Sequence, residues 1–226
     1  MKKMFTLGAM LLIAAVYAAD PMALIKEGQA AVKAKDFATA IAKYTEAQNA
    51  ATNSAQKSSA IYWRFRAMIQ QGKHTEARKF MAEAVEDETL KSANVRYLLN
   101  ELAAPYLWWP AQVKYALDIL KQAQNVEAPK TSNDYYRTYY YMACIYSTHL
   151  KQYETVIEIM SPIVKITGQH PANKYTACCM IGGAYEKLGK KDEALAAYKE
   201  ALTWAKKVTY KFSTQGAEKA IERLSK

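Results

Sequence analysis

Residues that could carry chemistry are few in this sequence, and they do not form a catalytic pattern. The three histidines, His74, His149 and His170, each fall where a turn is expected. None has a histidine, cysteine or carboxylate partner at the spacing of a metal site. No nucleophile, base and orienting group can be combined into a set. The sequence therefore predicts no catalysis, no cofactor and no metal.

Two further motifs have structural explanations. Glu86, Asp87 and Glu88 are consecutive carboxylates, which are more typical of the solvated end of a helix than of an acid and base pair. Gly182 and Gly183 lie inside a helical pattern and do not form a phosphate-binding loop. We expect the first glycine to permit close helix packing.

The three cysteines, Cys144, Cys178 and Cys179, leave at least one thiol unpaired if the compartment is oxidising. A bridge from Cys144 to either of the others is conceivable, because the pattern puts them on neighbouring helices. Small buried core residues are the interpretation we favour. The sequence has no Cys-x-x-Cys motif, so redox catalysis has no support.

The N-terminal segment 1–18 is predicted to be a cleaved secretory signal peptide. Two lysines precede an uncharged stretch from Met4 to Ala19, and Val16 and Ala18 place small residues before the cleavage point. An uncleaved anchor is the alternative, but the stretch is shorter than the roughly 20 apolar residues that span a bilayer. No cysteine follows the cleavage point, so we expect a periplasmic or secreted chain without a lipid anchor.

Composition favours one ordered helical body. Of 226 residues, 51% are hydrophobic and 23% charged, while glycine (8) and proline (6) are scarce. The net charge of +10 favours acidic surfaces such as anionic lipids, acidic peptides or cell-wall polymers, and an exported chain would not meet nucleic acid. The lysines and arginines are spread along the sequence, which favours solvated helix faces.

The stretch AYEKLGKKDEALAAYKEAL, residues 184–202, predicts two amphipathic helices joined by a turn at Gly189. Ala194 and Ala201 allow the helices to approach closely, and Tyr198 fills the space between them. A single hairpin would bury only one side of each helix, so stacked neighbours are expected. Similar patterns place a small residue at positions 40, 77, 116, 156 and 194, at intervals of 37 to 40 residues.

This pattern resembles the tetratricopeptide repeat, most closely in Gly182, Tyr185, Gly189, Ala194 and Tyr198. The resemblance implies an all-α, right-handed α-solenoid of about five helical hairpins plus a C-terminal capping helix. The single domain would cover residues 21–226, with units near 21–54, 58–91, 97–130, 137–170 and 175–208 and a capping helix at 213–225.

Two departures from the repeat pattern are expected to affect the fold. Every interval exceeds the 34 residues of the family's unit, so helices or connections must be longer. In the third unit, Pro105 and Pro110 should stop or kink the first helix near Ala104.

The resemblance also implies that the first helix of each unit lines a concave groove, where a partner would bind. The lack of a Lys and Asn clamp argues against gripping a terminal carboxylate. Within the groove, we expect Tyr62, Arg66 and Tyr141 to contribute most, because aromatic and arginine side chains dominate binding energetics. The candidate groove residues are Ile25, Gln29, Val32, Tyr62, Arg66, Ile69, Trp108, Trp109, Tyr141, Ile145, Cys179 and Glu186.

The function expected from these features is a non-catalytic exported scaffold or adaptor. It would bind an envelope protein or peptide in its groove, during bacterial envelope assembly or secretion. A carrier of a glycan or other small ligand is the alternative, with Trp108 and Trp109 as stacking platforms. Burial of both tryptophans beneath the following helix would argue against sugar stacking.

Overall fold

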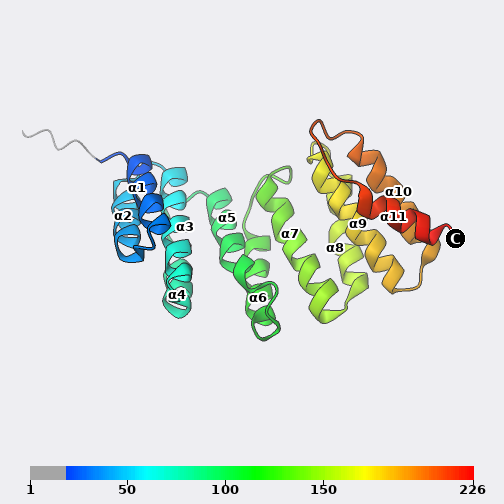
Figure 1. Cartoon of the computed structure of the whole chain (residues 1–226), viewed down its shortest axis with the longest axis horizontal. Coiled ribbons are helices and arrows are strands. Elements are labelled where there is room, and N and C mark those ends of the chain that lie inside the picture. Colours follow the sequence, from blue (N-terminus) through cyan, green and yellow to red (C-terminus); the bar gives the residue numbers. More distant parts are fainter. Residues whose placement is uncertain (1–18) are drawn as a thin grey trace, which may run out of the picture.

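The computed structural model describes residues 19–226, and the predicted signal peptide at 1–18 lies outside this range. The described residues are almost entirely helical (Figure 1). Among them, no helix is both long and apolar enough to cross a membrane. The α-helices are α1 (Pro21–Lys33), α2 (Phe37–Ala50), α3 (Ser54–Gln70), α4 (His74–Ala84), α5 (Ser92–Ala103), α6 (Val113–Asn125), α7 (Asn133–Ile145), α8 (Tyr153–Lys165), α9 (Pro171–Lys187), α10 (Lys191–Ala205) and α11 (Gln215–Leu224).

Helices pack in pairs that follow chain order, from α1 with α2 to α9 with α10. The pairs lie side by side along the long axis of the molecule (Figure 1), and the first helices α1, α3, α5, α7 and α9 contact one another in series. Within residues 19–226, this arrangement confirms the predicted all-α solenoid of about five hairpins. It places the first helices on one face and the second helices on the other.

The turns within four of the five pairs use one left-handed residue each. Gly72 and Gly189 have φ angles of 84° and 73°, and Lys35 and Lys151 adopt φ angles of 60° and 55° at the corresponding positions. Glycine adopts this conformation without strain, whereas lysine carries a Cβ that disfavours it. The predicted turn at Gly189 is therefore present. The same turn also forms where the sequence has no glycine.

The small residues that define the repeat are all in the core. Ala40, Ala77, Ala116, Val156 and Ala194 are fully buried. Small side chains at these positions let the paired helices pack closely, which explains why they recur at a regular interval in the sequence.

Two glycines allow a tyrosine to lie across the facing helix. A Cβ on Gly182 would come within 2.9 Å of Cζ of Tyr198, and a Cβ on Gly28 would overlap the ring of Tyr44. Both tyrosines are buried. The predicted packing role of Gly182 is confirmed, and Gly28 has the same role in the first pair.

The third pair is irregular where the prolines predicted it. Helix α5 ends at Ala103, and short 3₁₀ turns at Ala104–Tyr106 and Pro110–Gln112 precede α6. Proline disfavours helical conformation in the residue before it and cannot donate a backbone hydrogen bond. The connection is consequently longer than the turns of the other pairs, and it carries Trp108 and Trp109.

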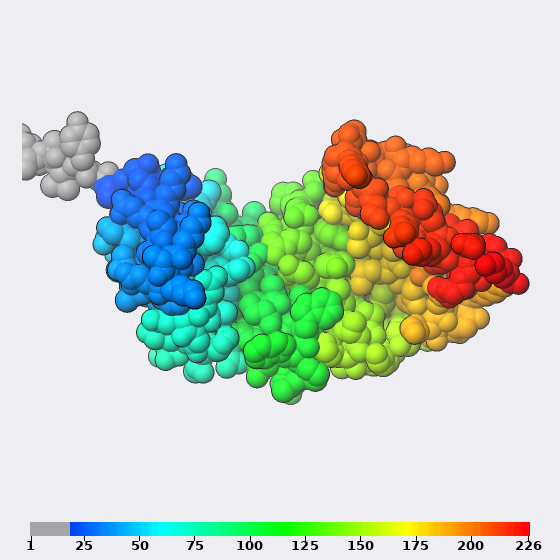
Figure 2. Space-filling model, in the orientation of Figure 1, coloured from blue at the N-terminus to red at the C-terminus, as the bar shows by residue number. Residues whose placement is uncertain are grey.

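The last helix, α11, covers the end of the solenoid as predicted. Ala217 and Ala220 are buried in a cluster with Tyr175, Ala194 and Tyr198. Phe212, just before the helix, packs edge-on against Tyr175 with ring centroids 4.7 Å apart. Figure 2 shows α11, in red, lying across the C-terminal helices. Without it, the apolar surface of α9 and α10 would face water.

The cysteines follow the core interpretation. Cys144 and Cys178 are buried, Cys179 is half-buried, and all three thiols are free. Burial raises the pKa of Cys178 to about 12. A thiol held protonated in this way is a poor nucleophile, which fits a packing role.

Candidate partner-binding groove

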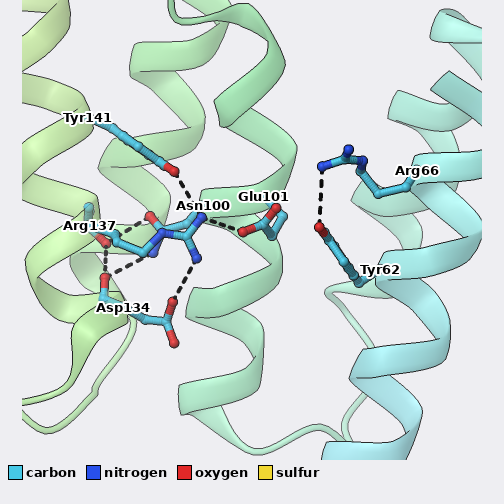
Figure 3. Close-up of polar contacts among 8 residues, drawn as sticks. Tyr62, Arg66, Asn100, Glu101, Asp134, Arg137 and Tyr141 are labelled. Carbon is cyan, nitrogen blue, oxygen red and sulfur yellow. Dashed lines mark hydrogen bonds and ion pairs between the residues drawn. The ribbon is translucent and has the colours of Figure 1, made fainter. Parts of the chain in front are cut away.

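A polar and aromatic group of side chains from α3, α5 and α7 lies on the face formed by the first helices, which is the face predicted to line the groove. Figure 3 shows Tyr62 and Arg66 projecting from α3 toward α5, opposite Glu101, Arg137 and Tyr141. We call these five residues the groove cluster. They come from three successive first helices, so the cluster spans the second, third and fourth pairs.

Arg137 is the hub of the cluster. Its guanidinium pairs with Glu101 on α5, donates to the Tyr141 hydroxyl at 2.9 Å, and contacts Asp134 Oδ1 at 3.3 Å. Burial alone would lower the pKa of Arg137, but the hydrogen bonds to Tyr141 and Glu101 outweigh it and raise the pKa. Arg137 therefore stays charged and holds both Glu101 and Tyr141 in place.

A buried hydrogen-bonded pair lies beneath this hub. Asn100 Nδ2 donates to the backbone oxygen of Asp134 at 2.9 Å, and the Thr138 hydroxyl donates to Asn100 Oδ1 at 3.0 Å. Asn100 and Thr138 are both fully buried. Buried amides and hydroxyls need partners, so this pair fixes the register of α5 against α7. The groove cluster is thus built on a rigid support.

Arg66 differs from Arg137 in having unused binding capacity. Its Nη1 donates to the Tyr62 hydroxyl at 3.3 Å, and it forms no ion pair within residues 19–226. The side chain is exposed. The Tyr62 ring packs at 5.6 Å from the ring of Tyr97, which leaves its hydroxyl toward Arg66. Most guanidinium donors of Arg66 therefore remain available to a partner.

Two hollows open between successive first helices. The one between α3 and α5 has a volume of about 350 Å³ and is lined by Arg66, Ile69, Gln70, Glu101, Ala104 and Pro105. The other, of about 430 Å³, lies between the end of α7 and α9. Its lining includes the two lysines Lys151 and Lys187 and the apolar residues Met180 and Ala184. Each hollow could hold one side chain of a bound segment.

The second hollow depends on a feature that the sequence did not predict. After α7, Tyr146–Leu150 forms a π-helical turn. This turn places Ser147 and Thr148 at the edge of the hollow, and Thr148 donates to the Cys144 carbonyl at 2.6 Å. Single π turns within helices are frequent at functional sites.

Two of the predicted groove residues belong to the core instead. Ile25 is 2% exposed and Ile145 is fully buried, so neither is available to a partner. A helix turns about 100° per residue, so an error of one position in register moves a side chain from the groove into the core. Gln29, Val32, Ile69 and Cys179 are half-buried.

Glu186 is engaged by the cap. Its carboxylate accepts hydrogen bonds from the Tyr198 hydroxyl at 2.7 Å and from Arg223 Nη1 at 2.5 Å. Glu186 therefore anchors α11 to α9. For Glu186 to contact a partner in the groove, as predicted, its carboxylate would have to lose the hydrogen bond from Arg223.

Trp108 and Trp109 lie in the long connection of the third pair and are 58% and 56% exposed. They are not packed beneath α6. The argument that burial would make against sugar stacking therefore does not apply to them. Trp109 lies 6.4 Å from the His74 ring at the start of α4, and His149 contacts the Leu107 carbonyl at 2.9 Å. These two contacts hold the connection between α5 and α6 against the turns of the second and fourth pairs.

The sequence missed Glu101 and Arg137. Arg137 stands in a run of tyrosines, and Glu101 lies in a leucine-rich helix. The feature of the sequence that could have indicated both residues is a charged side chain within an otherwise apolar helix face. Within residues 19–226, no group of histidine, cysteine and carboxylate side chains could hold a metal ion.

Comparison with known proteins agrees with this geometry. The tetratricopeptide repeat family model matches residues 175–208, which are the bounds predicted for the fifth unit. No curated protein sequence matches the chain significantly. Residues 175–208 are thus a tetratricopeptide repeat.

Solved structures extend the likeness to most of the chain. MamA is 20% identical, over 85% of this chain and 96% of its own, with a TM-score of 0.56. BtubC from P. vanneervenii is 17% identical, over 82% and 80%, with a TM-score of 0.59. YrrB, described as a TPR protein with an unusual peptide-binding site, is 16% identical, over 82% and 86%, with a TM-score of 0.50. The described residues therefore have the fold of tetratricopeptide repeat proteins.

Proposed function

We propose that this chain is a non-catalytic, exported scaffold that binds a segment of another protein in its concave groove. The observation that carries the proposal is the groove cluster. Arg66 and Glu101 line one hollow, Arg66 donates to the Tyr62 hydroxyl, and Arg137 donates to the Tyr141 hydroxyl and pairs with Glu101. Aromatic and arginine side chains contribute most at protein interfaces. The described solenoid holds them on rigid helices, which lowers the entropic cost of binding.

The chemistry of the cluster favours an extended peptide with both polar and apolar groups. Arg66 offers free donors to a carboxylate or backbone carbonyl. Ile69 and Pro105 line the adjoining hollow and would take an apolar side chain. Arg137, in contrast, is already paired with Glu101, so it shapes the site without adding net charge. YrrB supports the proposal to the extent that a protein of this fold has a peptide-binding site.

The test of binding is capture of partners by variants of the full chain. Tyr62→Ala combined with Tyr141→Ala removes the two aromatic side chains of the cluster while leaving Arg137 paired with Glu101. Tyr185→Ala is the control, because Tyr185 lines a hollow between α8, α9 and α10 on the opposite side. Pull-downs from envelope extract should lose a specific partner with the double variant only. Equal recovery of every protein by both variants would exclude this site.

We further propose that the chain acts in a bacterial envelope, in assembly or secretion, after removal of its first 18 residues. The support is the sequence pattern of two lysines, an uncharged stretch and small residues before position 19. Fractionation followed by mass measurement of the chain tests this. A periplasmic product starting near Ala19 is expected, and a full-length cytosolic product would contradict the proposal.

A further inference from the structure

A cluster of positive charge lies at the C-terminal end, away from the groove. The ammonium groups of Lys174 and Lys207 lie 4.1 and 4.2 Å from the centroid of the same Trp204 ring. Lys174 is only 5% exposed. The two lysines are 33 positions apart in sequence, on α9 and just after α10, so only the fold brings them together.

This cluster is not neutralised within the described chain. Neither lysine forms an ion pair in residues 19–226. Glu200, whose charge alone would raise the pKa of Lys174, accepts a hydrogen bond from the Trp204 indole at 3.4 Å. Burial and the neighbouring Lys207 both lower the pKa of Lys174. Holding two cations together costs free energy that a bound anion would recover.

The segment after α10 extends the positive charge onto an exposed surface. Lys206, Lys207 and Lys211 are all exposed, and the sequence from Ala201 to Ala217 contains no acidic residue. Tyr210, in the middle of this segment, is 55% exposed. An exposed tyrosine among lysines combines an apolar ring with a polar tip and with charge.

Neighbouring connections join this segment at the same edge of the solenoid. The Tyr210 ring stacks 6.1 Å from the ring of His170, at the start of α9. Gln169 donates to the backbone oxygen of Lys130, which is also exposed. Figure 2 shows the segment between α10 and α11, in dark orange, protruding at this edge. We call the exposed Lys130, Lys206, Lys207 and Lys211 the basic edge, and the buried Lys174 contacts the same Trp204 ring as Lys207.

We propose that the basic edge, with Trp204 and Tyr210, docks the protein onto an anionic lipid membrane. Several lysines on a protruding edge can meet many headgroups at once, each lysine near such a surface contributing on the order of 1 kcal/mol. Amphipathic aromatic rings favour the boundary between headgroups and acyl chains. An acidic protein would also use these charges, and the comparison of vesicles with soluble polyglutamate in the test distinguishes it from a membrane. The groove remains open to a partner in this arrangement.

The test measures binding of the full chain to vesicles by co-sedimentation. Vesicles of phosphatidylglycerol mixed with phosphatidylcholine are compared with pure phosphatidylcholine. The test variant is Lys207→Glu with Lys211→Glu, and the control is Lys114→Glu with Lys121→Glu on α6, which makes the same charge change at exposed positions elsewhere. Any contribution from residues 1–18 is common to all the proteins. Circular dichroism verifies that each variant is folded.

The wild type should bind the anionic vesicles and bind less as salt rises from about 50 to 300 mM. The test variant should bind at least about ten-fold more weakly, because it loses two surface lysines and gains repulsion. Tyr210→Ser should weaken binding without altering its salt dependence. Equal weakening by the control variant overturns the proposal, as does equal binding to neutral vesicles. Binding to soluble polyglutamate but not to vesicles overturns it in favour of an acidic protein partner.

Discussion

Glu186 on α9 receives hydrogen bonds from Tyr198 on α10 and from Arg223 on α11. One carboxylate thus joins the two helices of the last repeat to the helix that covers it. The Arg223 hydrogen bond is the main reason that the pKa of Glu186 lies below its ordinary value of 4.5. The packing of α11 on the end of the solenoid is therefore stabilised by the negative charge of Glu186.

The stabilisation supplied by Glu186 should disappear in acid. Because folding lowers its pKa, its contribution is full above pH 4.5 and is lost as pH falls through the folded pKa. Glu186→Gln should lower the Tm at pH 7 by on the order of 2–4 °C, and the gap from wild type should close below about pH 4. Scanning calorimetry between pH 3 and 7 measures this. Glu193→Gln, at an exposed position on α10, is the control; a gap that persists at pH 3 would contradict the role of charge.

Gly28 and Gly216 should respond in opposite ways to a methyl group. Gly28→Ala puts its Cβ into the Tyr44 ring and should destabilise the fold by about 1–3 kcal/mol. Gly216 in α11 has open space around a Cβ, so Gly216→Ala should be neutral or stabilise by up to about 1 kcal/mol. Urea denaturation gives both free energies of unfolding. Similar destabilisation by the two substitutions would show that the Tyr44 contact is not the cause.

Trp108 and Trp109 distinguish the protein-binding function from the alternative of glycan binding. Both are exposed in the connection before α6, so replacing both with alanine should change the free energy of unfolding by about 0.5 kcal/mol or less. Binding of a partner in the groove should be unchanged. Titration of wild type with cell-wall glycan fragments, followed by tryptophan fluorescence, tests the alternative. Saturable binding that the double variant loses would favour a glycan carrier.

Structural features with a local cause could be predicted from the sequence, whereas features that depend on the packing of distant segments could not. The end of α5 before Pro105 and the contact of Gly182 with Tyr198 were predictable, because each rests on backbone restriction or on a spacing that recurs. The prediction that Ile25 and Ile145 line the groove was wrong. A shift of one residue in helical register is enough to turn a side chain from the groove into the core.

Contacts between distant charges could not be predicted. Glu101 and Arg137 are 36 positions apart, and Lys174 and Lys207 are 33 apart. Both pairs meet only through the offset between stacked helices. Seen along the sequence, the lysines seemed scattered over solvated faces. The fold collects four exposed lysines at one edge and places the buried Lys174 next to Lys207.

Site-specific photo-crosslinking tests most directly whether a partner binds in the proposed groove. A photoreactive phenylalanine analogue would replace Ile69, which lines the hollow beside Arg66, or Ala196, which is exposed on α10 on the opposite face. In cells that express the protein, position 69 should crosslink to a specific protein and position 196 should not. Crosslinking of the same protein from position 196 alone would contradict binding in the groove.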